Sequence, residues 1–292
     1  MKCGNAEDMT ETQKERKAKA PRKLPRNRPR STIKQKSVDQ SQSSLFARLP
    51  SEIRHLIWLE TLGGQFLHIA RANKRLLAID CVESDPEFRE RWHGCWGGKS
   101  ANHCFGHVPG FYMGPRSDSS AKPANLLPLL QTCRRIYTET VVIIYKSNIF
   151  NINHIDTLLY MERSILRQRL NQTSILYLTC KLTLHEEPYF APYDIGTWRR
   201  ACSVLVGLTG LQELTIRLLG GLGDWIEPYE ELTGPLMEIK VAKRFDLLLP
   251  CSEKGCENFV RGKRFPFRVL SKPCLPLPSP ELVNGEKPNM EL

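Results

Sequence analysis

Helical and strand patterns alternate along the chain from residue 156 to residue 250. The segments SILYLTCKLTL and LQELTIRLLG carry apolar residues at every second position, as in strands with one buried face. TWRRACSVLVGL, which lies between them, has helical spacing, and YEELTGPLMEIKVA and RFDLLLP repeat the pair. Because repeated helix–strand units favour a parallel sheet with right-handed crossovers, we predict an α/β fold.

The strand patterns also share a sequence register. LTCKL begins at Leu178 and LTIRL begins at Leu214, 36 residues later, and Phe245 follows after a further 31 residues. Units of this length bury their apolar faces by stacking on their neighbours. The pattern is similar to a short, degenerate leucine-rich repeat. The alternative is a mixed α+β sheet in which the shared register arises by chance.

Two further elements are predicted before these repeats. LFARLPSEIRHLIWLETLGG predicts a helix, with Pro50 in its first turn and a glycine pair at its end, and QFLHIARANKRLLAID predicts a hairpin. A second, amphipathic helix is predicted in LLQTCRRIYTETVVIIYK, with Arg134, Arg135 and Glu139 on its polar face. Its apolar face comprises Leu130, Cys133, Tyr137, Thr140, Val141 and Ile144.

Charge and composition separate two tails from the domain. Residues 1–40 hold 12 Lys or Arg and 5 Asp or Glu, a net charge of +7, which leaves +4 of the total +11 for the remainder. We predict a disordered basic tail over residues 1–44, a single domain over 45–270, and a disordered Pro-rich tail over 271–292. The basic arm has no aromatic side chain to stack on bases, so it predicts only non-specific, salt-dependent attraction to nucleic acid.

An insert without periodicity occupies about residues 81–125 and contains HGCWGGKSANHCFGH. The Gly-Gly-Lys-Ser fails as a phosphate loop, because His93 stands where the first glycine of that motif belongs. The insert also offers ligands to zinc, but their spacing matches none of the familiar paired motifs. We therefore predict no metal site. The zinc candidates are Cys81, His93, Cys95, Cys104 and His107.

Catalytic motifs are not found in the sequence. There is no G-x-S-x-G and no H-E-x-x-H, and Cys133 falls on an apolar helix face, where a packing thiol is expected. We predict no enzyme, no catalytic residues and no cofactor.

The 10 cysteines are scattered and no apolar run is long enough to cross a bilayer. These features predict an intracellular protein of the nucleus or cytoplasm.

Two blocks resemble known sequences. Leu49-Pro-Ser-Glu-Ile-Arg resembles the core of the first helix of an F-box, and LLQTCRRIYTETVVIIYKSNIFNI is similar to the hallmark of a fungal F-box-like family catalogued as domain of unknown function 7730. Members of that family also share elements that appear here as Leu62-Gly-Gly, His68-Ile69, Cys95-Trp-Gly and Phe245 to Pro250.

The resemblance implies a non-enzymatic protein-interaction module, such as a substrate adaptor. In F-box proteins the first helix binds a Skp-type adaptor, and a repeat domain behind it holds the substrate. By this resemblance Leu49, Pro50, Ile53 and Ile57 would contact the adaptor. The alternative function is a zinc-stabilised nuclear protein that binds nucleic acid non-specifically through its basic arm. The deciding observation is whether the helix over residues 49–62 exposes its apolar face.

Overall fold

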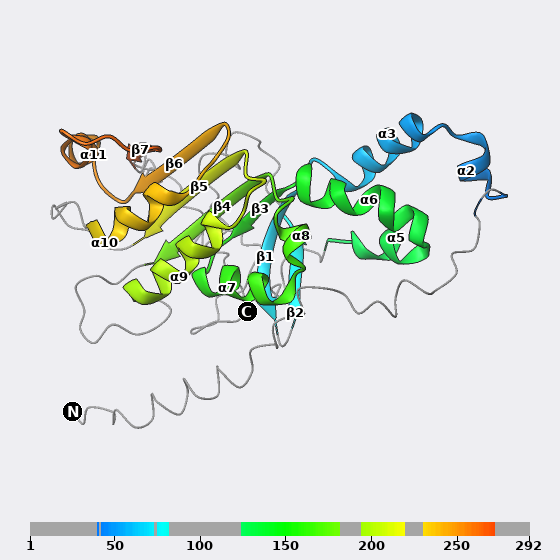
Figure 1. Ribbon diagram of the computed structural model, residues 1–292, viewed down its shortest axis with the longest axis horizontal. Coiled ribbons are helices and arrows are strands. Elements are labelled where there is room, and N and C mark those ends of the chain that lie inside the picture. The colour runs from blue at the N-terminus through cyan, green and yellow to red at the C-terminus, as the bar shows by residue number, and fades with distance from the viewer. Residues whose placement is uncertain are drawn as a thin grey trace, which may run out of the picture.

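The computed structural model describes residues 40, 42–72, 75–81, 124–181, 194–219 and 230–271. The predicted tails and insert lie almost entirely outside these ranges. Within them the chain forms a seven-stranded sheet of order β2-β1-β3-β4-β5-β6-β7, in which β1 and β2 are antiparallel and all other neighbours are parallel (Figure 1). Strands from β3 onward therefore follow one another in chain order. The α/β prediction is confirmed.

The strands have the following bounds: β1 (Phe66–Ala72), β2 (Arg75–Asp80), β3 (Ile149–Ile152), β4 (Ile175–Lys181), β5 (Glu213–Leu219), β6 (Arg244–Leu249) and β7 (Arg268–Ser271). The helices before β4 are α2 (Ser44–Arg48), α3 (Ser51–Leu62), α5 (Leu127–Thr132), α6 (Arg134–Lys146), α7 (Ile155–Ser164) and α8 (Arg167–Leu170). Those after β4 are α9 (Ile195–Val206), α10 (Glu230–Thr233), the 3-10 helix η2 (Gly234–Glu238) and α11 (Glu253–Val260).

The predicted register was right for one strand pair and wrong for the other. Leu214 lies opposite Phe245, as expected, but Leu178 lies opposite Ile216 and not opposite Leu214. The similarity of LTCKL to LTIRL therefore placed β4 two residues out of register. Because side chains alternate between the two faces, an even shift leaves the predicted buried face unchanged.

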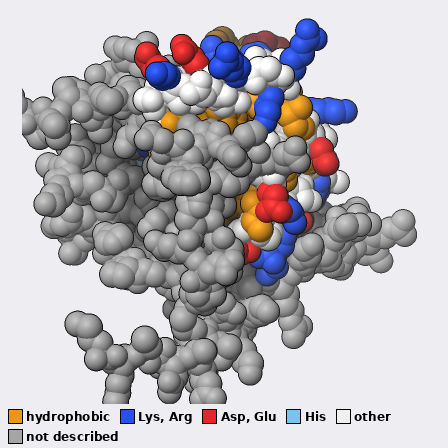
Figure 2. All heavy atoms as spheres, turned by 90° about the vertical axis from the view of Figure 1, so that its left-hand side faces the viewer, with side chains coloured by type: hydrophobic (Ala, Val, Ile, Leu, Met, Phe, Trp, Pro, Cys, Tyr) orange, Lys and Arg blue, Asp and Glu red, His pale blue; other side chains and the backbone are white. Residues whose placement is uncertain are grey.

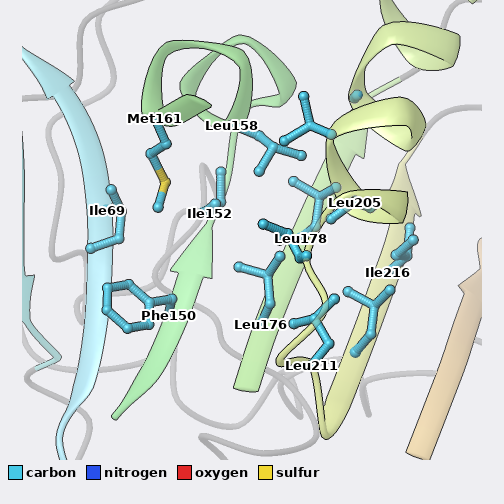
Figure 3. Close-up of a cluster of buried hydrophobic side chains, with 14 of the residues drawn as sticks. Ile69, Phe150, Ile152, Leu158, Met161, Leu176, Leu178, Leu205, Leu211 and Ile216 are labelled. Carbon is cyan, nitrogen blue, oxygen red and sulfur yellow. The ribbon is translucent and has the colours of Figure 1, made fainter. Parts of the chain in front are cut away.

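Aliphatic side chains line up across the helix-covered face of the sheet. One row runs through six strands with a single residue from each, and Figure 3 shows four of them beside Leu158 and Met161 of α7 and Leu205 of α9. The row comprises Ile69, Ile152, Leu178, Ile216, Leu247 and Val269. This stacking of one residue per unit explains why the repeat produces a continuous core.

The helices differ from the predicted pattern at three places. The amphipathic helix predicted through residues 130–144 is interrupted at Cys133, whose backbone is extended and whose Sγ accepts a hydrogen bond from the Ile136 N–H at 3.4 Å. The helical segment between β3 and β4 is likewise divided, into α7 and α8. A further helix, α11, matches no predicted element and begins after the capping residue Ser252.

Helices α3, α5 and α6 gather at one end of the molecule, past the strands that α7 and α9 cover (Figure 1). α6 packs against both α3 and α5 and leads directly into β3. The polar face predicted for α6 is only partly correct. Arg134 and Arg135 are exposed, whereas Glu139 is half-buried toward α3.

Removal of a helix side chain that packs on the aliphatic row should show how much the core between helices and sheet contributes to stability. Leu158 is fully buried on α7, and Leu158→Ala should lower the free energy of unfolding by about 3 kcal/mol because it leaves a cavity. Leu127→Ala is the matched control, since Leu127 is 61% exposed on α5, and it should change stability by less than about 0.5 kcal/mol. Urea denaturation of the two variants measures both values. Equal losses would contradict the assignment of Leu158 to the core.

Candidate functional site

Helix α3 has two faces of different character. Arg54, Trp58 and Leu62 recur at every fourth position and are buried. Four large aliphatic residues on the remaining surface of the helix are exposed: Ile53 at 44%, Leu56 at 59%, Ile57 at 38% and Leu59 at 38%. The helix therefore contacts its own domain through an Arg and a Trp and presents aliphatic side chains to solvent.

The buried face of α3 is held by one carboxylate of α6. Glu139 accepts two hydrogen bonds from the Arg54 guanidinium, at 3.1 and 2.9 Å, and a third from the Trp58 indole N–H at 3.0 Å. The hydrogen bonds from Arg54 are the main cause of the lowered pKa of Glu139, and Trp58 lowers it further. The same bonds raise the pKa of Arg54. This paired arrangement satisfies a guanidinium that would otherwise be costly to bury.

Arginine contacts also fix the segment that leads into α3. The guanidinium carbons of Arg54 and Arg135 lie 5.2 and 4.2 Å from the centre of the Phe46 ring, which comes from α2. Arg54 also donates to the backbone carbonyl of Leu49. Since the Arg54 guanidinium makes one of these cation–π contacts as well as this hydrogen bond, α2 and the Leu49-Pro50 bend are tied to the same point as α3.

Asn148 fixes the other end of the helix. Its side-chain amide donates to the carbonyl oxygens of Leu62, at 2.7 Å, and Ile144, at 3.0 Å, and its oxygen accepts from the Gln65 N–H at 2.8 Å. Asn148 is fully buried. It thus satisfies terminal carbonyls of both α3 and α6, which would otherwise be left without partners. Both ends of α3 are therefore fixed to the rest of the domain.

The structure brings two of the four predicted contact residues onto one exposed surface. Ile53 and Ile57 both lie on it, Pro50 is exposed at the start of α3, and Leu49 is half-buried. Leu56 and Leu59 complete the surface but were not among the predicted contacts. Leu56 could have been found, because it follows Ile53 at helical spacing. Among the nine large exposed hydrophobic residues of the described ranges, four lie on α3, so the exposure is clustered.

A row of polar residues crosses the sheet face opposite the aliphatic row, but His68, Asn151, Tyr177 and Asp246 in this row are each 7% exposed or less, so it offers no open binding surface. One polar residue from each of six strands forms a row across it, and these residues are His68, Asn151, Tyr177, Thr215, Asp246 and Arg268. His68 Nδ1 lies 3.2 Å from Asn151 Oδ1, and Arg268 donates to both oxygens of Asp246, at 2.8 and 2.9 Å. The period-two alternation of polar residues in β4 and β5 is the sequence signal that could have indicated this row.

The row ends at an open groove of about 500 Å³ beside β6 and β7. Figure 2 views this end of the molecule, where Lys and Arg side chains surround hydrophobic ones. The groove is lined by Lys243, Arg244, Phe245, Phe265, Pro266, Phe267 and Arg268. Arg244 and Arg268 pair with carboxylates of Glu213 and Asp246 at 2.7 and 2.8 Å. These pairs neutralise much of the groove's positive charge, which weakens it as a binding site for anions.

One comparison with known proteins, the comparison with family models, finds a match. The model of the family described as Domain of unknown function (DUF7730) matches residues 38–269. The chain belongs to the DUF7730 family. The match runs from just before α2 into the last strand, and therefore covers α3, the strands β1 to β6 and the first two residues of β7. No curated protein and no solved structure matches the chain.

The zinc candidates of this DUF7730 protein are not brought together in the described part of the chain. Cys81 lies at the end of β2, where its N–H donates to the Phe66 carbonyl at 3.0 Å. His93, Cys95, Cys104 and His107 lie outside the described residues. Within the described ranges, no three His, Cys, Asp or Glu side chains are grouped as metal ligands would be. The zinc hypothesis stays a prediction about the insert.

Cys133, considered as a nucleophile, caps the first turn of α6 and packs against the core. This contact fits the packing role expected for it.

In the described part of the chain, no helix combines the length and apolar character needed to span a membrane.

Loss of the Glu139 charge should weaken the attachment of α3 in a pH-dependent way. We expect Glu139→Gln to lower the free energy of unfolding by about 2 kcal/mol at pH 7, because a nearly buried guanidinium loses its counter-charge. The pKa of Glu139 is lowered from 4.5 in the folded state, so its contribution is complete above pH 4.5 and is lost as the pH falls through the folded value. The difference between wild type and variant should therefore shrink below pH 4.5.

Urea denaturation across this pH range measures the effect. Glu60→Gln on the exposed side of α3 is the control, and it should change stability little at any of these pH values. A difference for Glu139→Gln that stays constant from pH 7 to pH 3.5 would contradict the role assigned to this carboxylate.

Proposed function

We propose that this protein is an F-box-like protein-interaction module, in which the exposed face of α3 binds a Skp-type adaptor. The observation that carries the proposal is the orientation of α3. Its Arg54 and Trp58 face the domain, while Ile53, Leu56 and Ile57 remain at the surface. The resemblance of Leu49-Pro-Ser-Glu-Ile-Arg to the first F-box helix points to the same face as the adaptor contact.

The exposed face has the composition of a helical binding surface. Aliphatic side chains at positions 53, 56 and 57 form one turn-long stripe, and Ser51, Glu52, His55 and Glu60 supply an exposed polar surround. Binding energy in protein interfaces concentrates in a few apolar anchors that are shielded by such polar surroundings. An amphipathic helix laid into an apolar groove of the partner is a common recognition mode. These features favour a protein partner over a small-molecule ligand.

The attachment of α3 also favours binding. Its first two turns are held by Glu139 and its C-terminal end by Asn148, so the helix is ordered before a partner arrives. A preordered surface avoids the entropy cost that a mobile helix would incur on association. In the same proposal, the sheet behind α3 serves as the platform that presents a substrate.

The adaptor surface can be tested with single charged substitutions. Ile53→Asp and Ile57→Asp should each weaken binding of a purified Skp-type adaptor by more than about tenfold, because a buried aspartate opposes an apolar anchor contact. The Kd is measured by isothermal titration calorimetry with the full-length chain. Met237→Asp on η2 is the matched control, since Met237 is 46% exposed, close to the 44% of Ile53, and lies outside the proposed surface.

Both α3 variants should keep the wild-type circular dichroism spectrum and urea midpoint, because the replaced side chains are exposed. No binding by the folded wild-type chain, or equal binding by the wild type and both α3 variants, would refute the adaptor assignment.

A further inference from the structure

Cys251 and Cys256 face each other at the start of α11. Their Sγ atoms lie 2.9 Å apart, a separation short enough for a thiol–thiol hydrogen bond. Ser252, which lies between them, caps the helix by accepting a hydrogen bond from the Gly255 N–H at 3.2 Å, and the Cys256 N–H donates to the Ser252 carbonyl at 3.0 Å. The turn that places the two sulfurs together is therefore held by the backbone of the helix cap.

The two thiols differ in their access to solvent. Cys251 is half-buried in the loop after β6, whereas Cys256 is 6% exposed and packs in the core. Burial, with a smaller contribution from the hydrogen bond with Cys251, raises the pKa of the Cys256 thiol to about 12. A soluble oxidant therefore reaches the Cys251 thiol first, and the buried Cys256 thiol lies next to it.

The short sulfur–sulfur distance distinguishes this pair from the other described cysteines. Cys180 and Cys202 are each 1% exposed inside the core, so a soluble oxidant cannot reach them without unfolding. Cys133 is half-buried, but its Sγ accepts a hydrogen bond from the backbone of α6. Within the described ranges, Cys251 and Cys256 combine an accessible sulfur with a second sulfur in contact.

We propose that Cys251 and Cys256 form a dithiol site that hydroperoxides oxidise to an intramolecular disulfide. The Cys251 thiolate attacks one peroxide oxygen, the O–O bond breaks, and Cys251 becomes a sulfenic acid as hydrogen peroxide releases water. The Cys256 sulfur then attacks the Cys251 sulfur, and the S–O bond breaks. The displaced hydroxide leaves as water with the proton of the Cys256 thiol. Overall, two thiols lose two electrons and two protons, and one hydrogen peroxide becomes two waters.

This site is independent of the proposed function. It lies beside β6 and β7, at the opposite end of the sheet from α3 (Figure 1). The new bond would join the loop after β6 to the first turn of α11. α11 packs against β7, and its Phe259 ring stacks on Phe265 at 5.5 Å. Oxidation therefore joins α11, which packs against the last strand, to the loop that follows β6.

The experiment uses the full-length chain, fully reduced, freed of reductant and exposed to hydrogen peroxide. The protein is then unfolded in the presence of N-ethylmaleimide, which blocks every remaining thiol, buried ones included, and it is digested without reduction. Lys254 lies between the two cysteines, so trypsin leaves them on separate peptides unless a disulfide joins them. We expect one linked peptide pair carrying Cys251 and Cys256, two hydrogens lighter than the sum of its parts, and its loss after reduction.

Cys251→Ser should leave Cys256 labelled by maleimide after peroxide treatment, and Cys256→Ser should leave Cys251 as a sulfenic acid that dimedone traps. Cys133→Ser is the control and should form the linked pair as the wild type does. If Cys256→Ser does not fold, the variant Cys251→Ser, which replaces the more accessible of the two cysteines, still decides the outcome. Maleimide labelling of both cysteines after peroxide, or linkage of either one to another cysteine, would overturn the proposal.

Discussion

The position of α3 depends on the carboxylate of Glu139. This group binds Arg54 and Trp58 across 85 and 81 positions of sequence and also lies 3.5 Å from Arg135. Because the Glu139 carboxylate accepts from the buried side-chain donors of both Arg54 and Trp58, α3 has a defined orientation about its own axis. The aliphatic side chains left on the opposite surface are therefore presented by an ordered helix. The proposed interaction surface is a consequence of this polar anchor.

The sheet supplies the fixed frame behind that anchor. Its strands from β3 onward follow chain order, so each helix–strand unit stacks on the one before it and adds one residue to the aliphatic row. The opposite face carries a polar row in which His68 contacts Asn151 and Arg268 contacts Asp246. Fully parallel sheets are usually apolar on both faces. The polar row on the second face departs from that composition.

Sequence patterns predicted most elements of the fold, and the misses have local physical reasons. Period-two alternation found β4, β5 and β6, but it could not separate registers that differ by two residues, since both bury the same face. The helix predicted across Cys133 fails because that residue caps α6 with its own sulfur. α11 was missed because it is short and carries only two buried residues, Cys256 and Phe259.

The sequence alone determined that residues 51–62 form a helix, that the later units form a parallel sheet, and which side chains are aliphatic. Only the tertiary structure decided which side of α3 faces solvent. Residue hydrophobicity would place Ile53 and Ile57 inside and Arg54 outside. The reverse holds because Glu139, distant in sequence, provides the partner that makes burial of Arg54 and the Trp58 N–H favourable. Long-range pairing of this kind leaves no periodic signal in either segment.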